Sequence, residues 1–293
     1  MAFAGFKAFD IATTGTTIHG CTAGSGPPVL LLHGIPETHL MWRDVAPRLA
    51  EHHTVVATDL RGYGDSGKPP STPDHEPYSM RSIGRDQLEV MRHLGYDRFA
   101  VVGHDRGARC AYRLALDHPE AVERLAVLDI VPVGAAYARA DRAFTMAYWQ
   151  WAFLGAPEPV PERYLAAAPG VLVDYMTTAW TEVSDAIPAG VRAEYAAKLA
   201  DPATAHAICE EFRAAQTIDV RHDDEDRARG RTIQAPVLFL WGARGAVAQL
   251  YPDPLAIWRE FAGDVRGEPV PVGHFIPEEA PQDTAHRLLE FLR

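Results

Sequence analysis

Short apolar segments alternate with longer amphipathic ones in the first half of the chain. The apolar runs are residues 27–34, 53–60, 99–105 and 124–131. Because their apolar residues are continuous rather than alternating, these runs are typical of parallel strands that are covered on both faces. The segments between them, in which apolar residues recur three or four apart as in helices, are 40–52, 80–96 and 108–122. This alternation predicts a wound α/β fold, a mostly parallel central sheet flanked by helices.

The ends of the chain extend this pattern, and its middle interrupts it. Residues 6–24 contain Thr-rich runs broken by Gly15, which favours an antiparallel pair at the sheet edge. Strand-like runs resume at 236–242 and 267–275, and helical spacing follows at 254–262 and 280–293. Residues 133–231 have helical spacing and no strand-like run. We therefore expect a core domain from residues 1–132 and 232–293, with a helical lid inserted over 133–231.

Charge and composition exclude several classes of function. The net charge of −11 at pH 7 argues against nucleic acid as a partner, so any bound anion needs local arginines. No apolar run approaches the length of about 18 residues that a membrane span requires. The three cysteines form no Cys-x-x-Cys pair, and the N-terminus lacks the pattern of a secretion signal. These observations predict a cytoplasmic protein without a membrane partner.

One pentapeptide has the pattern of a nucleophile elbow, Gly103-His104-Asp105-Arg106-Gly107. In such elbows two glycines allow a sharp turn from a strand into a helix, and the central side chain is exposed at the turn. Here the central residue is Asp105, where serine is usual. The alternative interpretation is that Asp105 only caps the helix that follows, since aspartate is a favoured N-cap.

Two other motifs are weaker signals. Residues 62–67 match Gly-x-Gly-x-x-Gly, but the proline-rich segment after them cannot form the helix that a dinucleotide site needs. His222 is followed by Asp223, Asp224 and Asp226, which suggests a metal site. Acids interleaved with arginines more often mark a solvated helix face. We therefore expect no metal and no cofactor.

Three further stretches resemble the α/β-hydrolase superfamily. The segment His33-Gly34-Ile35-Pro36 is similar to its oxyanion loop, which implies that the backbone N–H groups of Ile35 and Arg106 stabilise an oxyanion. His274 follows the last strand-like run, where this superfamily carries its catalytic base. The acid that orients such a histidine stands at either of two usual positions. Asp129 occupies one of them within an apolar run, and Asp253 is a distant second candidate.

The order of these motifs along the whole chain resembles the haloacetate (fluoroacetate) dehalogenases, close to epoxide hydrolases and haloalkane dehalogenases. The most specific match is "DRGAR", residues 105–109. The resemblance implies that Asp105 is the nucleophile, and that Arg106 and Arg109 bind the substrate carboxylate. It implies a small anionic organohalide and water as substrates and no cofactor. The sequence leaves the oligomeric state open, with a homodimer as the candidate.

The lid departs from this family at the halide pocket. The family uses a histidine, a tryptophan and a tyrosine, and the matching residues here are Gln150, Trp151 and Phe212. Because phenylalanine cannot donate a hydrogen bond, we expect chloride or bromide to leave faster than fluoride.

Alternatives to this function remain open. An epoxide hydrolase would use the same Asp-His-Asp triad with lid tyrosines as proton donors; those available are Tyr148, Tyr164, Tyr175 and Tyr195. A hydrolase-like protein without activity could bind carboxylates through Arg106 and Arg109. The two arginines could instead pair with structural acids such as Asp129 or Glu37.

Overall fold

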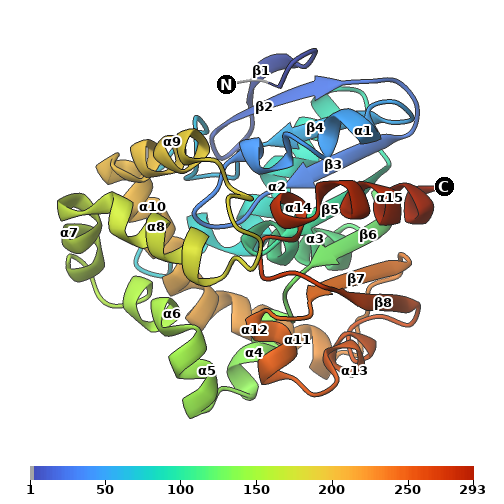
Figure 1. Cartoon of the computed structure of the whole chain (residues 1–293). Helices are drawn as coiled ribbons and strands as arrows, with labels where there is room; N and C mark the ends of the chain where they lie inside the picture. Colours follow the sequence, from blue (N-terminus) through green and yellow to red (C-terminus); the bar gives the residue numbers. More distant parts are fainter. Residues whose placement is uncertain (1–2) are drawn as a thin grey trace.

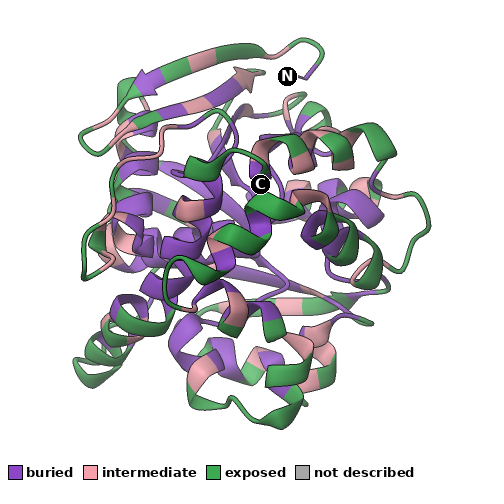
Figure 2. Ribbon diagram, turned by 90° about the vertical axis from the view of Figure 1, so that its left-hand side faces the viewer, coloured by how far each residue is buried: buried purple, intermediate pink, exposed green. Residues whose placement is uncertain are grey.

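The continuous apolar runs of the sequence form the centre of an eight-stranded sheet in the computed structural model, which describes residues 3–293 (Figure 1). The strands are β1 (Lys7–Ala12), β2 (Thr17–Ala23), β3 (Pro28–Leu32), β4 (Thr54–Thr58), β5 (Phe99–His104), β6 (Val122–Leu128), β7 (Val237–Gly242) and β8 (Val265–Val270). All six residues of β5 are buried, as expected for a central strand covered on both faces. Figure 2 shows the interior strands in purple beneath more exposed helices.

The sheet order is β1-β2-β4-β3-β5-β6-β7-β8. β1 pairs antiparallel with β2, and β2 with β4, whereas every other neighbouring pair is parallel. The predicted antiparallel edge pair and the mostly parallel sheet are thus confirmed. The chain goes from β3 to β4 on one side and then to β5 on the other. Ligands of wound sheets bind where the strand order reverses in this way, at the carboxyl ends of the strands.

The core helices differ from the sequence-based expectation at two places. Residues 40–52 form a 3₁₀ turn, η1 (His39–Trp42), and a short α1 (Ala46–Leu49) rather than one helix. Pro47 lies in the first turn of α1, where its missing N–H costs nothing, and it could not stand in the interior of a longer helix. The helix α3 (Arg106–Asp117) ends before Pro119, which also excludes its continuation to residue 122.

Three other core helices lie where the sequence pattern predicts them, namely α2 (Met80–His93), α13 (Pro254–Arg259) and α15 (Pro281–Leu292). Three short helices were not predicted, namely η2 (Glu76–Tyr78), α12 (Ala246–Leu250) and α14 (Ile276–Glu279). The Gly-x-Gly-x-x-Gly loop closes on itself through a bond from the N–H of Gly62 to the carbonyl of Gly67 at 3.0 Å. The next helical turn begins only at Glu76, so this loop has no helix N-terminus to offer a pyrophosphate.

Every regular element between β6 and β7 is helical. These are α4 (Val133–Ala138), α5 (Arg142–Ala147), α6 (Trp149–Leu154), α7 (Val160–Ala167), α8 (Pro169–Ala179), α9 (Ala189–Leu199), α10 (Pro202–Ala214), a π-helical turn η3 (Ala215–Asp219) and α11 (Val220–Ala228). In Figure 1, α6 to α9 lie on the left, away from β7 and β8. The domain boundaries at 132/133 and 231/232 stay a prediction.

The acids of α11 correct one expectation. Asp223 and Asp226 are buried rather than on a solvated face, because their spacing of three places both on the inner side of the helix. Asp223 accepts a hydrogen bond from the hydroxyl of Tyr112 at 2.9 Å, and Asp226 pairs with Arg113. These contacts attach α11 to α3, so both carboxylates have a structural role.

Two further observations concern the chain as a whole. Among residues 3–293, no helix has both the length and the apolar character needed to cross a membrane. The three cysteines, Cys21, Cys110 and Cys209, are free thiols and are buried.

Candidate active site

Asp105 lies at the turn between β5 and α3, as the elbow motif predicts. Its backbone has φ 47° and ψ −114°, a conformation that L-residues rarely adopt. The turn is tight because α3 starts against the strands: a Cβ on Gly107 would lie 2.4 Å from the carbonyl oxygen of His33. The side chain of Asp105 forms no cap bond to the helix. The interpretation of Asp105 as a plain helix cap is therefore wrong.

The carboxylate of Asp105 faces two of the predicted partners. Its Oδ1 accepts a hydrogen bond from the N–H of Ile35 at 3.2 Å. Its Oδ2 lies 3.8 Å from Nε2 of His274. A Cβ on Gly34 would lie 2.5 Å from that of Asp105, so only glycine allows the loop after β3 to come this close. Arg106, the second predicted backbone donor, directly follows Asp105 as the first residue of α3.

Asp129 and His274 meet beside Asp105. Nδ1 of His274 lies 2.6 Å from Oδ2 of Asp129. The other oxygen of Asp129 accepts the N–H of Gly242 at 2.8 Å, which fixes the carboxylate plane. Nε2 of His274 is buried and has no hydrogen-bond partner, so it is available to a ligand or water. The ends of β5, β6 and β8 thus bring together the three residues of the predicted triad.

Asp253, the second candidate for the orienting acid, has a different role. Its Oδ1 accepts the N–H of Ala256 at 2.9 Å and caps α13 on the surface. Of the two candidates, only Asp129 contacts His274.

Asp105 is ionised in this environment. Burial by itself raises the pKa of a carboxyl group, but His274, His104 and the following arginines outweigh burial and hold the pKa of Asp105 below its usual value. A nucleophilic carboxylate must be charged at neutral pH, and this surrounding keeps it so.

The two arginines after Asp105 differ in their surroundings. Arg106 is fully buried, and its Nε donates to Oε1 of Glu211 on α10 at 2.5 Å. Nη1 of Arg109 donates to the carbonyl of Val131 at 3.0 Å. Within residues 3–293, no carboxylate oxygen lies within 4 Å of the guanidinium nitrogens of Arg109. The sequence left open that the two arginines pair with structural acids such as Asp129 or Glu37. Neither arginine contacts those two residues, but Arg106 does pair with another acid, Glu211.

Both guanidinium groups retain buried N–H groups without a partner. These are Nη1 of Arg106 and Nε of Arg109. Burial and the adjacent Arg106 lower the pKa of Arg109. Leaving such a donor unsatisfied costs about 1–3 kcal/mol, which a bound anion would recover.

The lid residues of the predicted halide pocket lie over these arginines. The ring centroid of Trp151 is 4.5 Å from Cζ of Arg109, and that of Phe212 is 4.6 Å from Cζ of Arg106. The rings of Trp151 and Phe212 are 6.3 Å apart. Gln150 is buried, and its Oε1 has no hydrogen-bond partner.

Sequence analysis missed several residues near the site. Tyr137 packs against Trp151 at 5.3 Å between ring centroids, and its buried hydroxyl has no partner. Tyr251 and Asp219 also carry buried oxygen atoms without a partner. Glu211 binds Arg106. No motif marks these residues, since all but Tyr251 come from lid helices whose packing the sequence pattern does not specify.

A small cavity connects His274 with the lid. Its volume is about 180 Å³, and the lining includes Tyr148, Trp180 and Arg244 as well as His274. The ring of Trp180 contacts that of His274 edge-on at 5.3 Å. A molecule of a few heavy atoms can therefore approach the histidine from this side.

Potential metal ligands gather at one place in the described part of the chain, His19, His39 and Asp59. Oδ1 of Asp59 already accepts both the backbone N–H and Nδ1 of His39 at 2.8 Å, and Oδ2 accepts the N–H of Asp65. This carboxylate therefore holds the loop after β3 in place.

The interaction of His104 with Glu37 can be tested through the pH dependence of the protein's stability. Its Nδ1 lies 3.1 Å from Oε2 of Glu37. Burial disfavours the charged imidazole, but Glu37 outweighs burial and raises the pKa of His104 from 6.5 to about 9. A raised pKa means that this charge stabilises the fold fully below about pH 6.5 and that the contribution disappears as the pH rises through about 9.

We therefore expect the free energy of unfolding to fall between these pH values, and to fall less in His104→Gln. Urea denaturation at several pH values measures this. Identical pH dependence in both proteins would contradict the charged state of His104.

The comparisons with known proteins agree with this geometry. Residues 27–281 match the family model described as alpha/beta hydrolase fold. The chain belongs to the α/β-hydrolase family. It is 42% identical to a fluoroacetate dehalogenase of Burkholderia sp, over 99% of this chain and 95% of that one. It is 32% identical to a soluble epoxide hydrolase of a Corynebacterium species, over 94% of each chain.

Among solved structures, this α/β hydrolase resembles a protein from Nostoc sp PCC 7120 that is described only as an alpha/beta hydrolase. The two share 48% identity, each is covered to 99%, and the TM-score is 0.97. The predicted fold class and family are thus confirmed.

Proposed function

We propose that the protein hydrolyses small 2-haloacids such as haloacetate to a hydroxy acid and halide. One observation carries this proposal: Arg109 is buried next to Asp105, has no ion pair among the described residues and keeps an unpartnered N–H. A guanidinium group suits a carboxylate, and a neutral substrate would leave its charge unpaired. The arginine pair therefore favours an acid as substrate.

In this proposal each oxygen of Asp105 has a separate part. Oδ1 accepts the N–H of Ile35, which leaves Oδ2 to attack the carbon that bears the halogen. The carbon–halogen bond breaks, halide leaves with the electron pair, and an ester forms on Asp105.

Water then hydrolyses this ester. His274, oriented by Asp129, takes a proton from water, and the resulting hydroxide attacks Cγ of Asp105. The ester carbonyl becomes an oxyanion that the N–H groups of Ile35 and Arg106 stabilise. Cleavage of the bond from Cγ to the ester oxygen releases the hydroxy acid, as the departing oxygen takes the proton from the imidazolium of His274. The acid left on Asp105 then loses its proton to solvent, which restores the carboxylate.

The family also contains epoxide hydrolases, which makes that activity the second candidate. Of the four tyrosines considered above, Tyr164 and Tyr175 are 68% and 39% exposed, and Tyr195 is hydrogen-bonded to Glu278. Tyr148 packs against Trp151, and Tyr137 adds a hydroxyl that the sequence did not suggest. Tyr148 and Tyr137 thus remain as candidate proton donors to an epoxide oxygen. A neutral epoxide, however, offers no negative group to pair with Arg109.

The test compares the two substrates on purified protein. We expect bromide release from bromoacetate and little turnover of styrene oxide. Hydrolysis of styrene oxide without bromide release would replace the proposal by the epoxide hydrolase. If Arg106 and Arg109 only bind carboxylates, acetate will bind and neither substrate will be turned over.

The halide pocket leads to a prediction about the leaving group. A hydrogen bond to a charged group contributes about 1.5–3 kcal/mol, so one missing donor slows fluoride release by at least about tenfold. We expect chloroacetate and bromoacetate to react faster than fluoroacetate, and Phe212→Tyr to increase the fluoride rate relative to bromide. Ion-selective electrodes measure both rates. Fluoride release as fast as bromide release in the unmodified protein would contradict this prediction.

The remaining expectations from sequence stay predictions, namely a cytoplasmic location and a homodimer. For the homodimer the lid offers a candidate surface, since Met146, Tyr164 and Val171 are 73%, 68% and 69% exposed. Exposed apolar groups of this size are common at interfaces between proteins.

A further inference from the structure

Arg106 is held by a pair of residues that belong to different parts of the chain. Oε1 of Glu211 accepts Nε of Arg106 at 2.5 Å, and Oε2 accepts the hydroxyl of Tyr63 at 2.6 Å. Glu211 and Tyr63 are 1% and 2% exposed. Tyr63 lies in the glycine-rich loop after β4, and Glu211 lies on α10. Both oxygens of this carboxylate thus have a donor, one of them charged.

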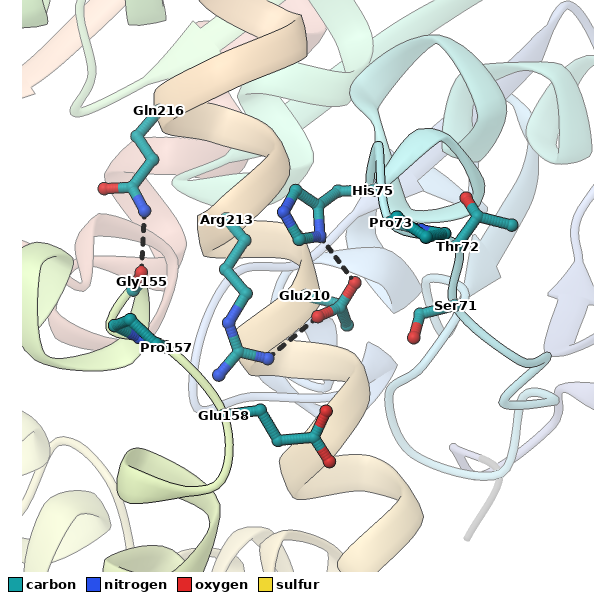
Figure 3. A pocket seen from close by; sticks show the side chains of 10 residues that line it. All are labelled: Ser71, Thr72, Pro73, His75, Gly155, Pro157, Glu158, Glu210, Arg213 and Gln216. Carbon is teal, nitrogen blue, oxygen red and sulfur yellow. Dashed lines mark hydrogen bonds and ion pairs between the residues drawn. The ribbon is translucent and has the colours of Figure 1, made fainter.

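The adjacent acid on α10, Glu210, has different partners. Glu210 accepts Nη1 of Arg213 at 2.8 Å and lies 2.8 Å from Nδ1 of His75 (Figure 3). These three side chains line an open cavity of about 570 Å³ between the lid and the loop before α2. Neighbouring positions of one helix therefore carry two acids, of which only Glu211 reaches the active site.

Arg106 lies directly after Asp105 in the chain but does not pair with it. The guanidinium group follows the predicted nucleophile directly, and it contributes to lowering the pKa of that carboxyl group. Yet among the described residues neither Arg106 nor Arg109 forms an ion pair with Asp105. Glu211 engages Nε of Arg106, and the Phe212 ring covers the guanidinium face at 4.6 Å. Nη1 remains as the unpartnered donor.

We infer that Glu211, supported by Tyr63, is a positioning residue that fixes the guanidinium of Arg106 and directs its free Nη1 to the substrate carboxylate. Without the negative partner, the guanidinium is no longer held in this orientation, and a substrate carboxylate binds less tightly. This inference rests on the proposed function, because it concerns recognition of an acid at the same site.

The test uses Glu211→Gln and a matched pair of substrates, chloroacetate and the neutral chloroacetamide. Glutamine can still accept the N–H of Arg106, but the variant removes the negative charge of the ion pair, so glutamine holds the arginine less firmly. We expect KM for chloroacetate to rise by at least about tenfold, while kcat/KM for chloroacetamide changes by less than about twofold. A purely structural role would reduce activity toward both substrates alike, and that result would overturn the inference, as would no change in either.

Two control variants and a binding measurement complete the test. Glu210→Gln removes a charge from the same helix without touching Arg106, and we expect no change in KM. Tyr63→Phe removes one support of Glu211 and should raise KM by a smaller factor. The Kd of acetate, measured by calorimetry, should increase about tenfold in Glu211→Gln. This binding does not require turnover: if bromoacetate proves not to be a substrate, an unchanged Kd would still refute the positioning role.

Discussion

Asp105→Asn is expected to reduce kcat for bromoacetate by about 10⁴-fold or more. The amide has the same shape and can still accept the N–H of Ile35, but it lacks the negative charge that attacks a saturated carbon. Bromide release, followed over hours at high enzyme concentration, measures the residual rate.

The variant should bind acetate at least as well as the unmodified protein, because the arginines stay in place and a repelling charge is lost. That measurement separates a lost nucleophile from a lost fold. Turnover within tenfold of the unmodified protein would show that Asp105 forms no covalent bond to the substrate.

His274→Ala is expected to separate the two chemical steps. Asp105 does not need the imidazole to displace bromide, whereas the water of the second step loses the base that Asp129 orients. The variant should release one equivalent of bromide per active site and then stop, with a steady-state rate lower by about 10³-fold or more. Mass spectrometry of the peptide that contains Asp105 should reveal one added carboxymethyl group.

Asp129→Asn provides the matched control for this variant. It keeps the base but removes the charge that orients His274 and stabilises its protonated form. We expect a slower second step and partial accumulation of the same ester. An unmodified Asp105 peptide in His274→Ala, next to an active unmodified protein, would exclude the ester mechanism.

Local sequence patterns predicted the elements of the sheet and the residues at their ends. Periodicity located β3, β5, β6 and β7, because a buried strand requires a continuous apolar run. The same patterns overestimated the helices around Pro47 and Pro119, where a missing N–H ends the helix. The helix face of Asp223 and Asp226 was also misjudged, because charge alone does not reveal which side of a helix packs inward.

The sequence by itself determined the fold class, through alternating strand-like and helical segments, and the family, through short motifs at the ends of strands. The same motifs selected Asp105, Asp129 and His274, whose side chains lie together in the structure. Only the tertiary structure decided which groups complete the site. Glu211 and Tyr137 come from lid helices, and their contacts with Arg106 and Trp151 depend on how those helices pack. Packing between distant segments has no local signature, so the different surroundings of Arg106 and Arg109 emerge only in three dimensions.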